Sequence, residues 1–238
     1  MLNKQKPEKT VEGREDGAVE VVQIWPTIQG EGPFAGCTAY FIRLAGCNLQ
    51  CPHCDTDYTS KRYLMDPQAI LYQLDSPKFK SDLVVISGGE PFRQELGILI
   101  IELTSHGFHV QIETNGTIYD DSFPYEVVQE DLTIVCSPKG GRVRKGLEDH
   151  LHCYKYVLQA GKVNSVDGLP LSTMGLKGSV ARPSQEWKDA NGPDSIYVQP
   201  LDEQDQSKNE LNNQACVKSA MMFGYRVSLQ THKYLGVE

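Results

Sequence analysis

Residues 46–56 read GCNLQCPHCDT, and three cysteines, Cys47, Cys51 and Cys54, fall within eight positions of this stretch. Their spacing is C-x3-C-x2-C, with a glycine before the first cysteine and Asp-Thr after the last. Three kinds of structure bring thiols so close together: a disulfide framework, a zinc site or an iron–sulfur cluster. Which of the three is present bears on the fold class, and the rest of the sequence is needed to choose between them.

The chain is acidic, with a net charge of −8 over 238 residues. Proteins that grip nucleic-acid backbones usually carry a basic balance or a basic face. One basic cluster, KGGRVRK at residues 139–145, is most simply a solvated loop. No apolar run approaches the roughly 20 residues of a membrane helix. We therefore expect neither nucleic acid nor a membrane among the partners.

The amino-terminal stretch, residues 1–16, is polar, mixed in charge and without the apolar segment of a secretory signal. It predicts a loose tail, followed by a single domain over residues 17–238. The expected location is cytoplasmic, where thiols stay reduced, so disulfides are the weakest explanation of the cysteines. Four further cysteines stand alone and are expected to be small buried hydrophobes: Cys37, Cys136, Cys153 and Cys216.

Strands and helices alternate along the chain. Apolar, β-branched runs predict strands at 20–24, 40–45, 82–87, 109–114, 132–136, 154–159, 195–199 and 225–230. Helical periodicity predicts helices at 68–74, 95–106 and 207–223. Alternation of this kind is typical of parallel β/α units. Three helices are too few for a closed eight-fold barrel, so the expected fold is α/β: a partial, open β/α barrel with mostly parallel strands.

The remaining segments complete this prediction. Residues 140–152 and 161–194 are rich in glycine, proline and polar residues, and both are expected to be loops. In the helix at 207–223, Leu211, Ala215 and Met222 share one face with the small Ser219, which predicts that this face packs on the domain. Gly107 and Gly224 follow the last two helices and are expected to end them.

The number of cysteines helps to distinguish a zinc site from an iron–sulfur cluster. A structural zinc ion takes four ligands, and a catalytic one takes three and a water. No fourth cysteine is near, and His53 sits awkwardly between Cys51 and Cys54 for a ligand to the same ion. An iron–sulfur cluster held by three thiolates leaves one iron open, which is useful where another molecule binds that iron.

A second motif is VVISGGEPF at residues 84–92, an apolar strand that ends in Gly88-Gly89-Glu90. In β/α proteins ligands bind at the carboxyl ends of the strands. Two glycines let the backbone approach a ligand closely, and a glutamate there can accept hydrogen bonds from an ammonium group. Taken alone, the motif is equally well an ordinary strand-to-helix turn.

Together, CxxxCxxC and a strand ending in GGEP resemble the radical S-adenosylmethionine (SAM) superfamily. The resemblance implies a [4Fe–4S] cluster on Cys47, Cys51 and Cys54, with the amino and carboxylate groups of SAM on the open iron. It also implies that one electron cleaves SAM to a 5′-deoxyadenosyl radical, which abstracts a hydrogen atom from the substrate. No protein side chain is then needed as the catalytic acid or base.

A longer set of motifs narrows the resemblance. PTIQGEG (26–32), QIETNG (111–116), CSPK (136–139), VQP (198–200) and SLQTHKYL (228–235) occur in this order. The set resembles the 7-carboxy-7-deazaguanine synthases, which convert 6-carboxy-5,6,7,8-tetrahydropterin to 7-carboxy-7-deazaguanine with loss of ammonia in queuosine biosynthesis. The resemblance implies a Mg²⁺ requirement, a homodimer, a small pterin substrate and a flavodoxin- or ferredoxin-type electron donor.

Substrate contacts follow from the same resemblance. They are assigned to Ile28, Gln29, Gly30, Arg43 and Ser87. Arg43 also stands out by itself, because a lone arginine in the apolar strand FIRLA should have an anionic partner. A bidentate clamp on the substrate carboxylate suits the guanidinium, and an internal ion pair is the alternative.

Cofactor contacts are implied in the same way. The SAM contacts are His53, Cys54, Asp55, Gly89, Glu90, Ser137, Pro138, Lys139 and Gln199. Thr56 matches a Mg²⁺ ligand, which agrees with the preference of this ion for oxygen. A turn in which the Thr56 hydroxyl caps the loop backbone is the alternative.

Two other functions compete. A glycyl-radical-enzyme activase would share the cluster and GGEP, yet it would need neither PTIQGEG nor an arginine aimed at a small carboxylate. A non-catalytic zinc-binding module belongs to a different class. Iron content after anaerobic purification separates the zinc module from both enzymes.

Overall fold

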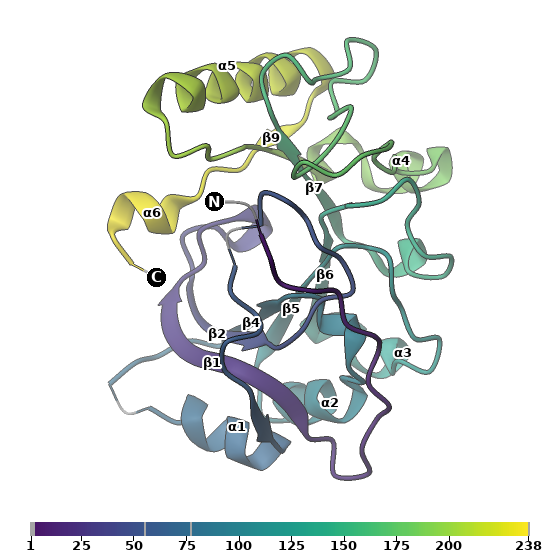
Figure 1. Cartoon of the computed structure of the whole chain (residues 1–238). Coiled ribbons are helices and arrows are strands. Elements are labelled where there is room, and N and C mark those ends of the chain that lie inside the picture. Colours follow the sequence, from purple (N-terminus) through teal and green to yellow (C-terminus); the bar gives the residue numbers. More distant parts are fainter. Residues whose placement is uncertain (1–2, 55, 77, 238) are drawn as a thin grey trace.

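The computed structural model describes residues 3–54, 56–76 and 78–237 (Figure 1). Within these residues the strands form one sheet in the order β3-β1-β2-β4-β5-β6-β7-β8-β9. Their bounds are β1 (Val19–Ile28), β2 (Thr38–Leu44), β3 (Tyr63–Met65), β4 (Leu83–Gly88), β5 (His109–Thr114), β6 (Leu132–Cys136), β7 (Cys153–Leu158), β8 (Ile196–Pro200) and β9 (Arg226–Val227).

The sheet is parallel from β2 to β9, and antiparallel only where β1 pairs with β2 and β3. β3 and β9 lie at opposite ends of the strand order and do not pair with each other, so the sheet stays open. The predicted open β/α arrangement with mostly parallel strands is therefore confirmed. The predicted strand at 225–230 is wrong in extent, because only two of its residues pair with β8.

The helices are α1 (Pro67–Leu74), α2 (Gly97–Ser105), α3 (Tyr125–Val128), α4 (Gln185–Asn191), α5 (Gln206–Phe223) and α6 (Thr231–Leu235). The three predicted helices correspond to α1, α2 and α5. Aspartate side chains begin α1 and α5: Asp66 accepts from the backbone N–H of Ala69, and Asp205 from that of Lys208. Gly224 ends α5 in the left-handed conformation, with φ of 77°, as its position predicts.

Three short helices escaped the sequence analysis, and one of them corrects a predicted loop. Within 161–194, Ser184 caps α4 through the N–H of Trp187, and the indole of Trp187 is buried and donates to the carbonyl of Leu151. A single buried aromatic residue anchors this helix. Periodicity misses it because seven residues are too few to show an apolar stripe.

The buried face of α5 also differs from the prediction. Ser219 is buried as predicted, but Asn212 and Cys216 are buried beside it, whereas Leu211 and Met222 are 55% and 61% exposed. The amide of Asn212 accepts from the N–H of Ala160 and donates to the carbonyl of Leu201. These hydrogen bonds to the ends of β7 and β8 set the rotation of the helix, which a count of apolar residues cannot reveal.

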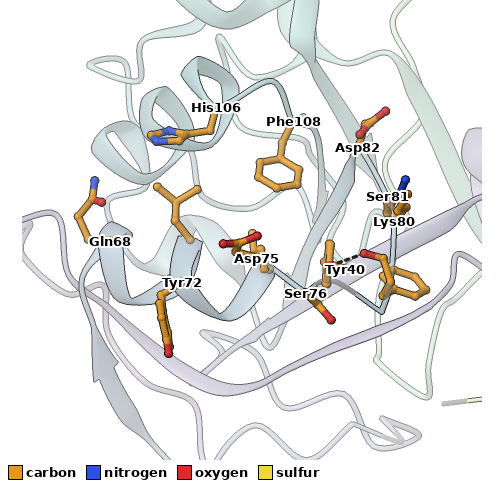
Figure 2. Close-up of a pocket in the computed structure, with 13 residues that line it drawn as sticks. Tyr40, Gln68, Tyr72, Asp75, Ser76, Lys80, Ser81, Asp82, His106 and Phe108 are labelled. Carbon is orange, nitrogen blue, oxygen red and sulfur yellow. Dashed lines mark hydrogen bonds between the residues drawn. The ribbon is translucent and has the colours of Figure 1, made fainter.

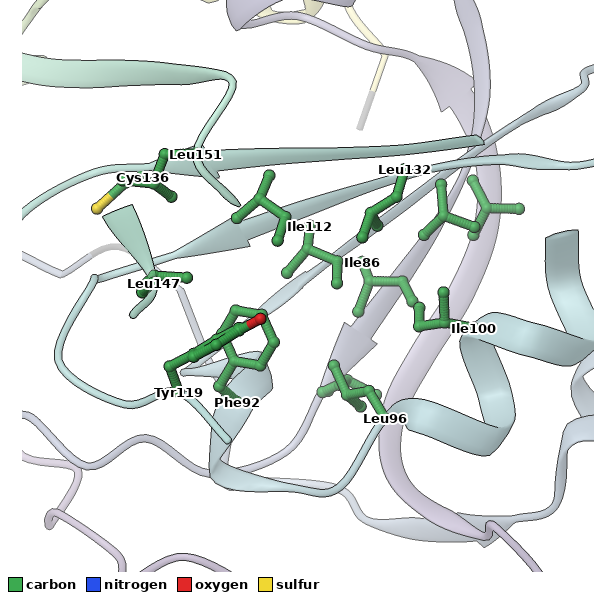
Figure 3. Close-up of a cluster of buried hydrophobic side chains, with 14 of the residues drawn as sticks. Ile86, Phe92, Leu96, Ile100, Ile112, Tyr119, Leu132, Cys136, Leu147 and Leu151 are labelled. Atoms are coloured by element: carbon green, nitrogen blue, oxygen red, sulfur yellow. The ribbon is translucent and has the colours of Figure 1, made fainter. Parts of the chain in front are cut away.

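The main hydrophobic core lies between one face of the sheet and the helices α1 and α2. Figure 3 shows Ile86 of β4 and Ile112 of β5 meeting Leu96 and Ile100 of the α2 region, with Phe92 beside them. All five are nearly inaccessible to solvent. Of the lone cysteines, Cys136, Cys153 and Cys216 are buried as expected, but Cys37 is exposed in the turn before β2, so that prediction is wrong.

The other face of the sheet, here called the inner face, carries polar side chains. Five steps in the strand order separate β1 from β7, about 24 Å in a flat sheet. Even so, Glu31, just past β1, forms an ion pair with Lys155 of β7. The sheet therefore curves, so that its inner face wraps around a polar interior, which is the open-barrel shape visible in Figure 1. Among the described residues, no helix has the length and apolar character to cross a membrane.

Candidate active site

The motifs singled out in the sequence meet at one edge of the sheet. Gly46 follows β2, Glu90 follows β4, Asn115 follows β5 and Ser137 follows β6. Because parallel strands end on the same side, these segments become neighbours. The Glu90 N–H donates to the carbonyl of Gly46, and the Ser137 N–H to that of Thr114, at 3.0 and 2.8 Å.

The cluster loop, residues 46–58, carries the three cysteines at this edge. Cys47 and Cys51 are 7% and 8% exposed, and Cys54 is half-buried. Burial raises the pKa of the Cys47 thiol to about 12 and that of Cys51 above its usual range. Iron ions would displace these protons, because a bound metal deprotonates its thiol ligands. The donor set therefore suits a cluster that brings its own positive charge.

Glycines shape the wall of this loop. A Cβ atom at Gly89 would overlap the carbonyl oxygen of Gly46 and lie 2.8 Å from Cβ of Cys47. Gly88 has φ of 143°, a conformation that favours glycine. The backbone of the GGEP turn thus lies directly against the first cysteine. This close approach leaves no room for a side chain at position 89 and fixes the first cysteine against the turn.

A single-ion metal site is less well supported. In residues 3–54, 56–76 and 78–237, no three His, Cys, Asp or Glu side chains converge to hold one metal ion. His53 is exposed, and its backbone N–H donates to the carbonyl of Met174 at 3.1 Å. Asp55 lies outside the described residues, so its predicted contact with SAM stays a prediction.

The amino-terminal segment is bonded to the cluster loop, in contrast to the expected loose tail. Residues 3–11, here called the strap, cross this loop. The Asn3 side-chain amide donates to the carbonyl of Cys51 at 3.2 Å, and that of Gln5 to the carbonyl of Thr56 at 2.8 Å. The backbone N–H of Glu8 donates to the carbonyl of Cys47 at 2.7 Å. Polar composition suggested disorder, whereas these polar groups pair with backbone carbonyls that have no partner in a strand or helix.

Glu90 braces the GGEP turn from inside. It is fully buried, and its carboxylate accepts from the Thr114 hydroxyl at 2.7 Å and from the N–H groups of Asn115 and Phe92. Burial raises its pKa to about 7 in spite of these donors. Its predicted role as a SAM ligand stays a prediction, and the structure adds a tie between the ends of β4 and β5.

The segment after β6 supplies the next side of the site. Pro138 is buried, and the ammonium of Lys139 donates to the hydroxyl and the carbonyl of Ser137 at 2.6 and 2.9 Å. Burial lowers the pKa of Lys139, while the neighbouring Cys51 thiol opposes this change. The three residues therefore place one ammonium group close to the cluster loop.

Arg43 points to the inner face from β2. Its guanidinium stacks over the ring of Trp25, 4.7 Å from the centroid, and Ser87 lies opposite it in the register of β4. Among the described residues no carboxylate forms an ion pair with it. This favours a guanidinium kept for a ligand over an internal ion pair. The substrate contacts of Arg43 and Ser87 stay predictions.

A buried charge network, which the sequence analysis missed, lies beside them. The Lys155 ammonium pairs with Glu31, and with Glu113 at 3.1 Å; the three side chains are 5%, 16% and 18% exposed. Burial alone would raise the pKa of Glu31, but the charge and hydrogen bond of Lys155 hold it well below its usual range. A lysine inside the apolar strand YKYVLQ was the available signal, by the same argument that singled out Arg43.

The loop after β1 joins this network. Gln29 is buried, and its amide donates to Glu113 at 3.2 Å, while Gln111 donates to the same oxygen at 2.9 Å. The side-chain carbonyl of Gln111 is buried and has no hydrogen-bond partner among the described residues. A buried acceptor without a donor is costly, so this atom is suited to receive one from a ligand.

The carboxyl-terminal segment closes the same side. The N–H of Thr231 donates to the carbonyl of Gly30 at 3.1 Å, and the Gln230 amide to Glu31 at 2.7 Å. A Cβ atom at Gly30 would overlap the ring of His232. Gln199 is buried in β8 and accepts from the Ser228 hydroxyl at 3.2 Å. Gly30 thus lies beside this charge network, and the predicted substrate contacts of Ile28 and Gly30 stay predictions.

A surface pocket lies at the opposite edge of the sheet. Figure 2 shows Tyr72, Asp75, Lys80, His106 and Phe108 around it, near α1 and the start of β4. The GGEP residues that follow β4 lie at the other end of that strand. We therefore place the candidate active site at the carboxyl edge, where six side chains form the inner wall: Arg43, Ser87, Gln111, Glu113, Lys155 and Gln199.

Comparisons with known proteins agree with this geometry. Residues 41–135 match the radical SAM superfamily model. The chain is 39% identical over 224 residues to 7-carboxy-7-deazaguanine synthase of Rhodospirillum rubrum, covering 91% of this chain and 92% of the relative. It is 38% identical over 243 residues to the enzyme of that name from Rickettsia prowazekii, covering 98% and 94%. The crystal structure of QueE from Escherichia coli has a TM-score of 0.67 at 22% identity, covering 92% of this chain and 99% of that one, and shows a shared fold.

Proposed function

The chain belongs to the 7-carboxy-7-deazaguanine synthase family of radical SAM enzymes, and from this premise we propose that it converts 6-carboxy-5,6,7,8-tetrahydropterin to 7-carboxy-7-deazaguanine with loss of ammonia. The observation that carries the proposal is the inner wall. In this wall, the guanidinium of Arg43 has no ion-pair partner among the described residues, and it lies on the same face of the sheet as buried hydrogen-bond acceptors. Both lie at the edge of the sheet that bears the cluster loop.

The substrate is complementary to this wall at both of its ends. A carboxypterin carries a carboxylate at one end, which suits the planar fork of Arg43 and the Ser87 hydroxyl. At the other end it carries amino and ring N–H donors. Glu113 and the partnerless carbonyl of Gln111 are acceptors for such donors. Gln29 and Gly30 border the same space, and we assign them substrate contacts through groups other than the Gln29 backbone and the Gly30 carbonyl, which already bond Cys37, Gly36 and Thr231.

Membership of the superfamily implies a [4Fe–4S] cluster and SAM. We assign the cluster to Cys47, Cys51 and Cys54, and SAM contacts to the GGEP turn, Ser137, Lys139 and Gln199. When bound, these groups supply a carbon-centred radical that removes one hydrogen atom from the substrate. The protein's own residues hold the pterin against the GGEP turn and exclude water, and we assign no side chain as acid or base.

Mg²⁺ is the third cofactor of the proposal, with Thr56 as its protein ligand. Thr56 is half-buried, and its carbonyl is held by Gln5, so the hydroxyl has a defined place in the cluster loop. Mg²⁺ prefers few protein oxygens, with the rest from water or substrate. Thr56 would hold the ion through one oxygen, and the ion would supply positive charge to neutralise the substrate carboxylate. We also propose a homodimer and a flavodoxin- or ferredoxin-type donor.

One experiment tests the function. The protein is reconstituted with iron and sulfide without oxygen and incubated with SAM, dithionite, Mg²⁺ and the carboxypterin. We expect the product mass of 7-carboxy-7-deazaguanine, and no product from a Cys51→Ala variant. 5′-Deoxyadenosine without that product, appearing only with a partner protein, would favour the activase. Absence of iron and presence of one zinc per chain would favour the non-catalytic module.

A further inference from the structure

A group of exposed cations, here called the basic rim, surrounds the cluster loop of this acidic protein. The rim comes from three segments: the strap, the loop after β6 and the loop before α4. Its members are Lys4, Lys6, Arg142, Arg144, Lys145 and Lys177. Throughout the described part of the chain, none of them forms a salt bridge.

Printed contacts join the three segments around the same loop. Asn48, between the first two cysteines, donates to the Thr117 hydroxyl at 2.8 Å, and the Arg144 N–H donates to the carbonyl of Gly116 at 2.8 Å. One turn therefore separates Arg144 from the cluster loop. On the strap, Asn3 bonds the carbonyl of Pro52 at 3.0 Å, which puts Lys4 beside it.

The loop that carries Lys177 closes the ring. Its Met174 carbonyl accepts from the N–H of His53, and its Ala181 N–H donates to the carbonyl of Gly140 at 2.7 Å. This loop therefore touches both the cluster loop and the loop that leads to Arg142. The three segments that carry the rim cations are thus joined to one another around the cluster loop.

The surface inside the rim is the nearest approach to the cluster. Cys47 and Cys51 are buried, and the residues that cover them outwardly are Leu49, which is half-buried, and Gln50 and His53, which are exposed. None of these side chains carries a fixed charge. Two exposed acids lie nearby: Asp57 accepts from the N–H groups of Thr59 and Ser60 in its own turn, and Asp121 lies beside Gly146.

We propose that the basic rim is the docking surface of a small acidic electron-carrier protein, which delivers one electron to the cluster through the tip at Gln50. The proposal rests on the proposed function, since it assumes that Cys47, Cys51 and Cys54 hold a redox cluster. In the step, one electron leaves the carrier's reduced flavin or iron–sulfur centre, and the cluster charge falls by one. No bond is made or broken.

The arrangement of charge fits this partner. Redox encounters have small interfaces and depend on electrostatic steering for their rate. A ring of unpaired cations around a neutral tip attracts an acidic surface and centres it over the cluster. The net charge of −8 opposes association elsewhere on the molecule, so the rim also supplies specificity. RNA is the rival occupant of a basic patch, and the test includes it.

The test compares two electron sources. The triple variant Arg142→Glu, Arg144→Glu, Lys145→Glu is reduced either by photoreduced flavodoxin of acidic pI or by dithionite, and cluster reduction is followed by its electron paramagnetic resonance signal. We expect the flavodoxin concentration for half-maximal rate to rise at least ten-fold at low salt, and the salt dependence to flatten. The rate with dithionite should stay within two-fold. A Lys177→Glu variant in the second loop should give a smaller rise in the same direction.

The matched control reverses three exposed cations away from the rim: Lys78→Glu, Lys80→Glu, Lys218→Glu. Equal losses in the rim and control triples would mean that net charge alone acts, and would overturn the proposal. So would an unchanged flavodoxin dependence in the rim triple, with RNA binding as the property that the triple loses instead. If the parent protein makes no 7-carboxy-7-deazaguanine with dithionite, the proposed function is wrong. Cluster reduction by flavodoxin can still be compared between the parent and the rim variants, so the two failures are distinguishable.

Discussion

The cluster loop and the inner wall lie at the same edge of the sheet, yet they are held in opposite ways. The cluster loop is tied by neutral hydrogen bonds, from Asn3 and Gln5 of the strap to the carbonyls of Cys51 and Thr56. The inner wall is tied by buried charges, with Lys155 between Glu31 and Glu113. A loop that must accept a charged cluster gains from neutral supports, whereas a wall that receives a polar ligand gains from fixed charges.

The largest effect is expected from removing the central charge of the inner wall. Lys155→Met should lower the free energy of unfolding by about 3 kcal/mol, because two largely buried carboxylates lose their cation. Urea unfolding of the cluster-free protein measures it. A triple variant that adds Glu31→Gln and Glu113→Gln should regain much of that stability but no activity. Equal stability of Lys155→Met and the parent would refute the network.

Glu90 links the two regions, and its titration sharpens the comparison. Its folded-state pKa of about 7 lies above the unfolded value, so the folded protein binds the extra proton. Stability should therefore fall as the pH rises from about 4.5 to 7, by about 3 kcal/mol in total. In Glu90→Gln this component disappears. The difference between the urea midpoints of parent and variant across that window isolates it, and parallel pH profiles would contradict the assignment.

Arg43 belongs to the wall but is stacked on Trp25 and has no ion-pair partner among the described residues, so its effect should fall on binding. Arg43→Lys should raise the KM for the carboxypterin about ten-fold, since a point charge replaces a two-pronged donor. The cluster content and the affinity for SAM should survive. An unchanged KM with a lower melting temperature would instead give Arg43 a purely structural role.

The strap offers the corresponding change on the neutral side. Asn3→Ala with Gln5→Ala removes two hydrogen bonds to loop carbonyls, each worth about 1 kcal/mol. We expect iron loss to a chelator to become several-fold faster, and the urea midpoint to fall by no more than the loss of these two hydrogen bonds explains. Lys9→Ala, an exposed change on the same strap, is the control. Identical chelation rates in all three proteins would mean that the strap does not support the loop.

The smallest effect is expected at Thr56. Thr56→Ala should keep the cluster and SAM cleavage but weaken the dependence of product formation on Mg²⁺ by a few-fold, because one oxygen ligand is lost while water and substrate supply the others. Thr56→Ser should restore most of it. A Mg²⁺ titration of product yield checks both variants. The same curve for alanine and the parent would leave Thr56 as a turn residue.

The sequence by itself determined the parallel strands and the position of the GGEP turn after β4, because these signals are local, and it gives the cluster cysteines as a prediction. Spacing along a loop and period-two apolar runs need only neighbouring residues, and β5 and β6 agree with their predictions to the residue. The predictions that were wrong concern features that do not depend on neighbouring residues alone. The face of α5, the two-residue β9 and the anchored helix α4 depend on partners far away in the chain, such as Ala160 for Asn212.

Only the tertiary structure decided how the inner wall and the supports of the cluster loop are assembled. Glu31, Glu113 and Lys155 lie up to 124 positions apart, and they meet because the sheet curves and brings the end of β1 to β7. The strap is likewise held by hydrogen bonds to carbonyls of the cluster loop, and amino-acid composition alone could not predict these distant partners. Curvature and long-range hydrogen bonding arise from the sum of all strands, so no single segment of the sequence carries them.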